Sequence, residues 1–184
     1  MGIVFNKKFE RGCMLVLGGA KSGKSSFAMD ISNSMKRERI FLATAQALDQ
    51  EMEERITRHQ AERGSDWRTV EEYLKVPETI DSLDSKETVI LLDCLTLWLN
   101  NLYMEHGEDQ EVINEAIENL LRQLTDIRGA VVIVSNEVGM GIVPDNQLSR
   151  RYRDTAGYAN QSIARLAGKV VAVLAGLPLV LKDE

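Results

Sequence analysis

The sequence predicts an α/β fold of three layers, in which a mostly parallel central sheet is flanked by helices. Two observations support this class. Short runs rich in Val, Ile and Leu recur along the chain, and longer segments with helical periodicity separate them. The short runs are apolar at consecutive positions, which is typical of parallel strands covered on both faces. Alternation of strands and helices then implies an α/β sandwich with right-handed crossovers.

The predicted strands are these short apolar runs. We expect them at residues 13–17 (CMLVL), 40–43 (IFLA), 89–93 (VILLD), 130–135 (AVVIVS) and 169–174 (KVVAVL), with a short last strand at 179–181. Residues 1–12 precede the first strand, so we interpret them as an accessory segment.

The predicted helices lie between the strands. The clearest spans residues 111–128, where Ile and Leu recur every three or four residues and Gly129 stands in the C-cap position. Further helices are expected at 24–35, 50–62, 95–105 and 147–166. Because we find neither an internal repeat nor a linker, we expect residues 1–184 to form a single domain.

Composition mainly excludes classes of function. The chain has 184 residues, with 28 Asp and Glu against 22 Lys and Arg, and the net charge of −6 argues against a generic nucleic-acid-binding protein. The N-terminal stretch is too short and polar for a signal peptide, and no apolar run approaches the roughly 20 residues that span a bilayer. Cys13 and Cys94 lie in apolar runs, which indicates buried thiols of a reducing compartment. We therefore expect a cytosolic protein.

The strongest motif is a phosphate-binding loop that matches G-x-x-x-x-G-K-[ST] and directly follows an apolar strand. It consists of Gly18, Gly19, Ala20, Lys21, Ser22, Gly23, Lys24 and Ser25. The glycines let the backbone N–H groups surround an anion, and a helix that begins near Lys24 adds its positive end. Lys24 can reach the terminal phosphates, and the Ser25 hydroxyl can bind Mg²⁺. A chance glycine-rich turn is the alternative, but the flanking strand and helix favour the phosphate-binding loop. We expect the three-layer fold to be that of a P-loop NTPase of the RecA-like kind.

Asp93 is the expected acidic partner of this loop. It ends the apolar run VILLD, and we expect it near the metal, at the end of a strand that neighbours the loop's own strand. The alternative is an aspartate that caps the following helix, since Thr96 and residues 97–99 continue in a helical pattern. The two motifs together predict a nucleotide and Mg²⁺ without specifying a reaction.

His59 is one of only two histidines and has two interpretations. On a helix, Met52, Ile56 and His59 share one stripe, and this spacing alone favours a structural histidine at the border of an apolar face. A neutral imidazole can also be a nucleophile, because its ordinary pKa of about 6.5 leaves a lone pair free at pH 7. His106, beside Gly107 and acidic residues, is interpreted as a solvated loop histidine.

A series of motifs resembles one enzyme family. In chain order it comprises the loop GGAKSGKS, the run Ala43, Thr44 and Ala45, EMEERITRH at 51–59, WRTVE at 67–71, NEVGMGIVP at 136–144 and RYRDTAG at 151–157. The series resembles the bifunctional adenosylcobinamide kinase/adenosylcobinamide-phosphate guanylyltransferase family of cobalamin biosynthesis. The resemblance covers residues 14–182, and NEVGMGIVP is its most specific string.

The resemblance implies two reactions. In the first, the terminal phosphate of ATP or GTP passes to the hydroxyl of the aminopropanol arm of adenosylcobinamide. In the second, that phosphate receives GMP from GTP, which gives adenosylcobinamide-GDP and pyrophosphate. In this family a histidine carries the GMP, and the matching residue is His59, which reverses the preference from spacing. The family also implies a homo-oligomer, since its members assemble as trimers with sites near subunit contacts.

The resemblance further implies a set of nucleotide contacts. These map onto the phosphate loop, Ala43, Thr44, Ala45, Gln60, Ala61, Glu62, Arg63, Glu71 and Asp93. Glu71 can accept hydrogen bonds from the guanine N1 and N2 donors, although a surface carboxylate after a short strand is the alternative. Arg55 or Arg58 can compensate phosphate charge, with a solvated helix face as the alternative for either.

Residues 136–144 are interpreted as a loop on the substrate or metal side. Asn136 and Glu137 follow an apolar strand, where active-site residues stand in a sheet of this kind. Arg150, Arg151 and Arg153 are candidate contacts to phosphate or corrinoid, and a solvated arginine-rich helix start is the competing interpretation.

Two other functions compete with this one. A plain P-loop kinase with a structural His59 would phosphorylate a hydroxyl group without a covalent nucleotidyl intermediate. A nucleotide-switched protein of the RecA-like kind would act on DNA or on a protein partner. The acidic net charge and the lack of a basic or aromatic stripe argue against the latter.

Overall fold

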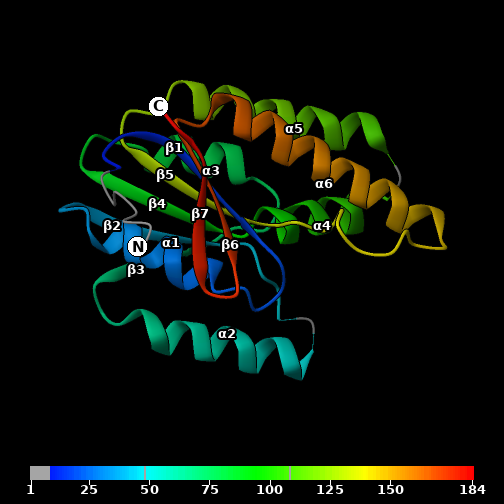
Figure 1. Cartoon of the computed structure of the whole chain (residues 1–184), viewed down its shortest axis with the longest axis horizontal. Coiled ribbons are helices and arrows are strands. Elements are labelled where there is room, and N and C mark those ends of the chain that lie inside the picture. Colours follow the sequence, from blue (N-terminus) through cyan, green and yellow to red (C-terminus); the bar gives the residue numbers. More distant parts are fainter. Residues whose placement is uncertain (1–8, 48, 108) are drawn as a thin grey trace.

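The structure, a computed structural model, describes residues 9–47, 49–107 and 109–184, without the side chains of residues 51, 55, 58, 59 and 61–63. The elements follow one another as β1 (Gly12–Gly18), α1 (Lys24–Asn33), β2 (Glu38–Ala43), α2 (Gln50–Arg63), β3 (Trp67–Glu71), α3 (Val76–Leu83), β4 (Thr88–Asp93), α4 (Leu95–His106), α5 (Gln110–Thr125), β5 (Ala130–Asn136), α6 (Gln147–Leu166), β6 (Lys169–Leu174) and β7 (Leu177–Asp183). Figure 1 shows their arrangement.

The described strands form one sheet in the order β3-β2-β4-β5-β1-β6-β7. Every neighbouring pair is parallel except β6 and β7, which pair antiparallel. Because strands of a parallel sheet point the same way, the loops after β1, β2, β4 and β5 all emerge at one edge. That edge carries the phosphate-binding loop, which confirms the predicted α/β class.

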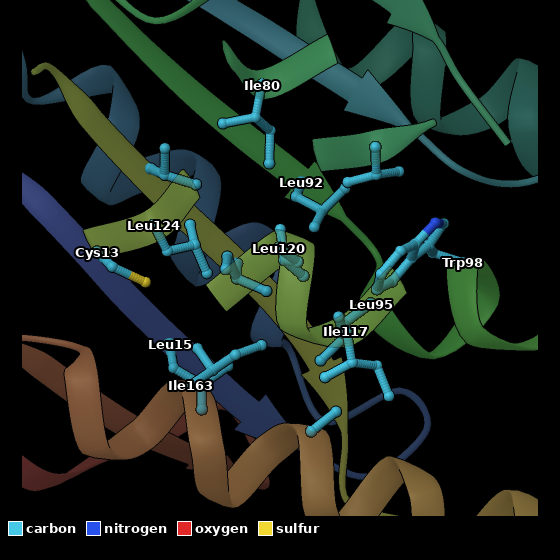
Figure 2. Packing of buried hydrophobic residues seen from close by; sticks show 14 of the residues in the cluster. Cys13, Leu15, Ile80, Leu92, Leu95, Trp98, Ile117, Leu120, Leu124 and Ile163 are labelled. Carbon is cyan, nitrogen blue, oxygen red and sulfur yellow. The ribbon is translucent and has the colours of Figure 1, made fainter. Parts of the chain in front are cut away.

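Helices cover both faces of the sheet and bury a core on each. On one face, α3, α4, α5 and α6 pack against alternate strand residues such as Leu15 and Leu92 (Figure 2). On the other face, α1 packs against Met14 and Val16. Helix α2 lies on the same side of the sheet as α1, as Figure 1 shows. This alternation explains why β1, β4 and β5 are apolar at consecutive positions.

Two elements were missing from the predicted set, and the last strand is longer than predicted. Strand β3 lies at the sheet edge, and only Trp67 among its residues is buried, so its sequence lacks a continuous apolar run. Helix α3 has eight residues, with Pro77 in its first turn, which is too short for a periodic pattern. Strand β7 begins at Leu177 and ends at Asp183, where the sequence predicted only residues 179–181.

Three local predictions at helix ends were wrong. Helix α5 ends at Thr125 with Asp126 as its C-cap, so Gly129 caps no helix. A glycine is needed at position 129 because of close backbone packing. A Cβ there would clash with the carbonyl oxygen of Ser85 and lie 2.7 Å from the carbonyl oxygen of Thr88. Helix α1 ends at Asn33, two residues before the predicted end. His106 is the last residue of α4 and not a loop residue, although it is exposed as expected.

The cysteines, the helices and the N-terminal segment can also be compared with the predictions. Cys13 and Cys94 are both buried and free, as predicted. No described helix is long and apolar enough to cross a membrane. Of the proposed accessory segment, residues 1–8 lie outside the described residues, whereas Phe9 is buried in the core beneath α1.

Candidate active site

The phosphate-binding loop joins β1 to α1 and is closely packed against the β6–β7 hairpin. Gly23 has a φ of 93°, which strains any residue with a side chain, and its Cβ position lies 3.3 Å from the Cα of Gly176, so a larger residue would also be crowded. The backbone N–H of Gly176 donates to the carbonyl oxygen of Ser22 at 2.9 Å. The antiparallel hairpin therefore supports the loop from one side.

The side chains of the loop are arranged for an anion. The Lys24 ammonium donates to the carbonyl oxygen of Gly19 at 3.0 Å, which holds it across the loop. The buried Ser22 hydroxyl has no hydrogen-bonding partner within the described chain. Since α1 begins at Lys24 with no side-chain cap, its first N–H groups also remain available to a phosphate.

A pocket with a cavity volume of about 80 Å³ lies between this loop, the sheet edge and α2, and we call it the α2 pocket. The described residues that line it are Lys24, Ser25, Phe41, Ala43, Ala45, Met52, Ile56, Gln60, Glu71, Asp93, Cys94, Leu97 and Asn136.

Asp93 lines the α2 pocket, but its strand has a different position in the sheet from the one predicted. Its strand, β4, was predicted to lie next to the strand of the phosphate-binding loop, β1, but β5 lies between them. Asp93 still lines the pocket with Lys24 and Ser25, because β4 and β1 end at the same edge of the sheet. It does not cap the following helix, whose N-cap is Cys94.

Thr44 fixes the strand ends behind the pocket. Its hydroxyl donates to the carbonyl oxygen of Cys94 at 2.8 Å and accepts from the N–H of Cys94, also at 2.8 Å. The side-chain amide of Asn101 donates to the carbonyl oxygens of Thr44 at 2.8 Å and Tyr73 at 3.1 Å. These buried bonds tie together the segments after β2, β3 and β4, so Thr44 supports the pocket and does not line it.

Glu71 ends β3 with its carboxylate at the pocket. The Tyr73 hydroxyl donates to it at 2.9 Å. Burial raises the pKa of Tyr73, and the hydrogen bond to Glu71 and the charges of Glu71 and Glu72 raise it further. The phenol therefore stays protonated and donates to one carboxylate oxygen, which keeps a second lone pair, and the other oxygen is fully available to a ligand.

Asn136 presents an unused acceptor at the pocket. Its amide nitrogen donates to the Thr96 hydroxyl at 3.0 Å, and its backbone carbonyl accepts from Asn160 at 3.2 Å. Its side-chain oxygen is buried and has no partner within the described chain. A buried oxygen without a hydrogen bond costs free energy, so this oxygen is suited to accept a hydrogen bond from a bound ligand.

Cys94 lines the pocket but is not arranged as a nucleophile. Burial raises the pKa of its thiol, and the charge of Asp93 raises it further, against smaller lowering effects of Thr96, Leu97 and Lys24. Since the thiolate is the reactive form of cysteine, this thiol is held inactive at neutral pH.

Helix α2 carries the segment of the predicted nucleophile. Asp49 caps it by accepting from the N–H of Met52 at 2.8 Å. Met52, Ile56 and Gln60 line the pocket, and position 59 lies between the last two along the helix. The side chains of His59, Ala61, Glu62 and Arg63, and those of Arg55 and Arg58, lie outside the described residues.

Glu137 and Arg153 are not in the α2 pocket. Both line a second hollow with a cavity volume of about 800 Å³, which we call the α6 pocket. Arg150 donates to the carbonyl oxygens of Pro144 at 3.0 Å and Asp145 at 2.7 Å, so it holds its own loop. The predicted substrate loop is thus divided, with Asn136 in one pocket and Glu137 in the other.

Sequence reasoning missed several residues that build the site. The Gly176 turn was invisible because its partner lies more than 150 residues away. Asn101 was detectable, since a polar residue within the apolar run LTLWLNNLY is buried and bonded. Phe41 and Leu97 line the pocket, but as apolar residues in an apolar sequence they carried no signal.

The loop after β1, the helix that follows it and the shared pocket of Lys24, Ser25 and Asp93 define a P-loop NTPase fold. Solved structures are similar in fold. A prototypical ATPase from the type III secretion system of pathogenic bacteria has a TM-score of 0.55 at 12% identity, over 88% of this chain and 50% of that one. The flagellar accessory protein FlaH from Methanocaldococcus jannaschii has a TM-score of 0.52 at 11% identity, over 94% and 79%.

The chain belongs to the cobinamide kinase/cobinamide phosphate guanyltransferase (CobU) family, whose pattern it matches over residues 14–181. The bifunctional adenosylcobalamin biosynthesis protein CobP of Pseudomonas aeruginosa is 44% identical over 170 residues, which cover 92% of this chain and 97% of that protein. The bifunctional adenosylcobalamin biosynthesis protein CobU of Escherichia coli is 37% identical over 180 residues, which cover 92% and 99%. The family resemblance drawn from the motifs is therefore confirmed.

Proposed function

We propose that this chain, within one domain, phosphorylates adenosylcobinamide with ATP or GTP and then transfers GMP from GTP to the adenosylcobinamide phosphate. Membership of a family with both activities supports the pair of reactions. The observation that carries the assignment of residues is the α2 pocket, in which the phosphate-binding loop, Asp93, Glu71 and helix α2 meet.

The residues of the pocket have separate roles in this proposal. Lys24 and the loop N–H groups bind the nucleotide phosphates, while Ala43, Ala45 and residues 60–63 surround the rest of the nucleotide. Thr44 contributes indirectly, because it fixes the strand ends behind the pocket. Glu71 accepts from guanine N1 and N2, which prefers GTP over ATP in the second reaction. Apolar Phe41 and Ile56 provide surface for the base and ribose.

Ser25 and Asp93 suit Mg²⁺. Both line the α2 pocket, and hydroxyl and carboxylate oxygens are ligands that Mg²⁺ prefers. No group of three or more His, Cys, Asp or Glu that could hold a metal occurs among the described residues, and Mg²⁺ bound with a nucleotide needs only one or two protein ligands. When bound, the ion would neutralise charge on the phosphates.

We further propose that His59 carries the GMP. An imidazole nitrogen attacks the α-phosphorus of GTP, a P–N bond forms, and the bond to the β-phosphate oxygen breaks to release pyrophosphate. An oxygen of adenosylcobinamide phosphate then attacks the same phosphorus, and the P–N bond breaks to free the imidazole. Position 59 lies on α2 within one turn of the pocket-lining Ile56 and Gln60, which supports this role.

Labelling tests this step. Incubation with GTP labelled on the α-phosphate should give protein-bound label that is lost in acid and stable in alkali, and His59→Ala should abolish it. His106→Ala is the matched control, because it removes the other histidine, which is exposed at the end of α4. Label that survives His59→Ala, or wild-type protein that takes up none, would contradict the intermediate.

Kinase activity should survive His59→Ala, because phosphorylation needs no covalent nucleotide. This separates loss of the intermediate from loss of the fold. We also propose that the protein is a homo-oligomer, as the family resemblance implies, and sedimentation of the purified chain tests it directly.

A further inference from the structure

The α6 pocket is a second hollow at the same edge of the sheet as the phosphate-binding loop. Its cavity volume of about 800 Å³ is about ten times the 80 Å³ of the α2 pocket and lies within the roughly 300–1,000 Å³ typical of small-molecule sites. Residues of three segments line it, among them Leu17 of β1, Glu137 and Val143 of the loop after β5, and Arg153, Tyr158 and Gln161 of α6.

We propose that the α6 pocket binds the corrinoid macrocycle of adenosylcobinamide, while the α2 pocket binds the nucleotide. This inference rests on the proposed function, which requires a second, much larger substrate beside the nucleotide. It assigns that substrate a place in the fold.

The first argument is position relative to the phosphates. Leu17 directly precedes Gly18, the first residue of the phosphate-binding loop, and the N–H of Glu137 donates to the carbonyl oxygen of Gly18 at 3.2 Å. Asn136 lines the α2 pocket and the next residue, Glu137, lines the α6 pocket. A macrocycle in the α6 pocket can therefore extend its hydroxyl arm to the phosphates across the end of β5.

The second argument is chemical complementarity. A corrinoid is a broad, largely apolar ring whose edge carries carboxamide groups, which both donate and accept hydrogen bonds. The lining offers an acceptor in Glu137, a donor in Arg153 and both in Gln161. Glu137 Oε1 also accepts from the N–H of Gly139 at 2.8 Å, and Arg153 lies 3.7 Å from the carboxylate of Asp154, so both side chains are held in place. Leu17, Val143 and Ala164 add apolar surface to the same hollow, as expected for a site that orients an amphipathic ligand.

The third argument is the exposed apolar surface of the loop after β5. Met140, Ile142 and Val143 are 87%, 97% and 60% exposed, although Val143 also lines the pocket. Adjacent exposed apolar side chains indicate a surface that another molecule covers. Because Glu and Asp are depleted at protein–protein interfaces, the carboxylates of Glu137 and Asp154 in this hollow favour the macrocycle over a second copy of the chain.

Equilibrium dialysis with adenosylcobinamide tests the site. The visible absorption of the corrinoid on each side of the membrane gives the amount that the protein binds. Val143→Ser should weaken corrinoid binding roughly five- to tenfold, from the loss of apolar contact. Arg153→Gln should weaken it as well, and the KM for nucleotide should stay unchanged in both. Met104→Ser is the matched control, because Met104 is 59% exposed on α4, close to the 60% of Val143, and should leave both quantities unchanged.

The outcomes separate this inference from the proposed function. Wild-type protein that phosphorylates adenosylcobinamide, with corrinoid binding unaltered in both variants, would overturn the corrinoid site alone. A changed sedimentation coefficient in Val143→Ser would also overturn it, because the loop would then lie between copies of the chain. Wild-type protein that neither binds nor phosphorylates adenosylcobinamide would overturn the proposed function first.

Discussion

Helices α5 and α2 both carry apolar residues at helical spacing, but they use them differently. In α5 the stripe is buried in the core, with Leu120 fully inaccessible against the sheet (Figure 2). In α2 the described apolar residues, Met52 and Ile56, are half-buried and line the α2 pocket. The same periodicity therefore builds a core where a sheet lies opposite and a ligand site where a cavity lies opposite. Changes in α5 should alter stability, and changes around the α2 pocket should alter binding.

The largest effect is expected in the core. Leu120→Ala should lower the free energy of unfolding by about 2–5 kcal/mol, because it removes buried methyl groups and leaves a cavity. Urea denaturation measures the change, and the KM for GTP of the folded variant should equal that of the wild type. A loss below about 1 kcal/mol would mean that α5 is not the packed helix of this comparison.

Glu71→Gln should reduce the preference for guanine by about tenfold to a hundredfold in GMP transfer. The glutamine side chain keeps one oxygen that accepts from guanine but has an NH2 group in place of the other oxygen. This NH2 group faces a guanine N–H, so neither donor has an acceptor. Competition between GTP and ATP in the labelling reaction measures the ratio. Glu78→Gln, an exposed glutamate of α3, is the control, and an unchanged ratio in Glu71→Gln would remove this residue from base recognition.

Ile56→Ala sharpens the comparison directly, because it makes the same kind of truncation in α2 as Leu120→Ala makes in α5. We expect the KM for GTP to rise about fivefold, which corresponds to about 1 kcal/mol of lost apolar contact. The urea midpoint should barely move, since Ile56 is only half-buried. A loss of stability as large as that of Leu120→Ala would show that α2 belongs to the core.

The two regions also differ in how much of them the sequence could reveal. The core strands and α5 were predictable because their periodicity is local, and the phosphate-binding loop because its motif is continuous. The pocket depends on contacts between distant segments, such as Thr44 with Cys94 and Gly176 with Ser22, which leave no local pattern. Edge strand β3 was missed for a related reason, since an edge position needs no buried run, yet it supplies Glu71.

The final prediction concerns Cys13, which lies in the core beneath α5. Burial raises the pKa of its thiol from 9.0 to about 12. Because the folded state disfavours the thiolate, this contribution to stability is constant below pH 9 and is lost as the pH rises from 9 towards 12. Between pH 8 and pH 10 the wild type should therefore lose about 1 kcal/mol more than Cys13→Ala, which has no thiol to ionise. Urea denaturation at both pH values measures how the free energy of unfolding of each protein changes with pH. An equal change in the wild type and in Cys13→Ala would show that water reaches this part of the core.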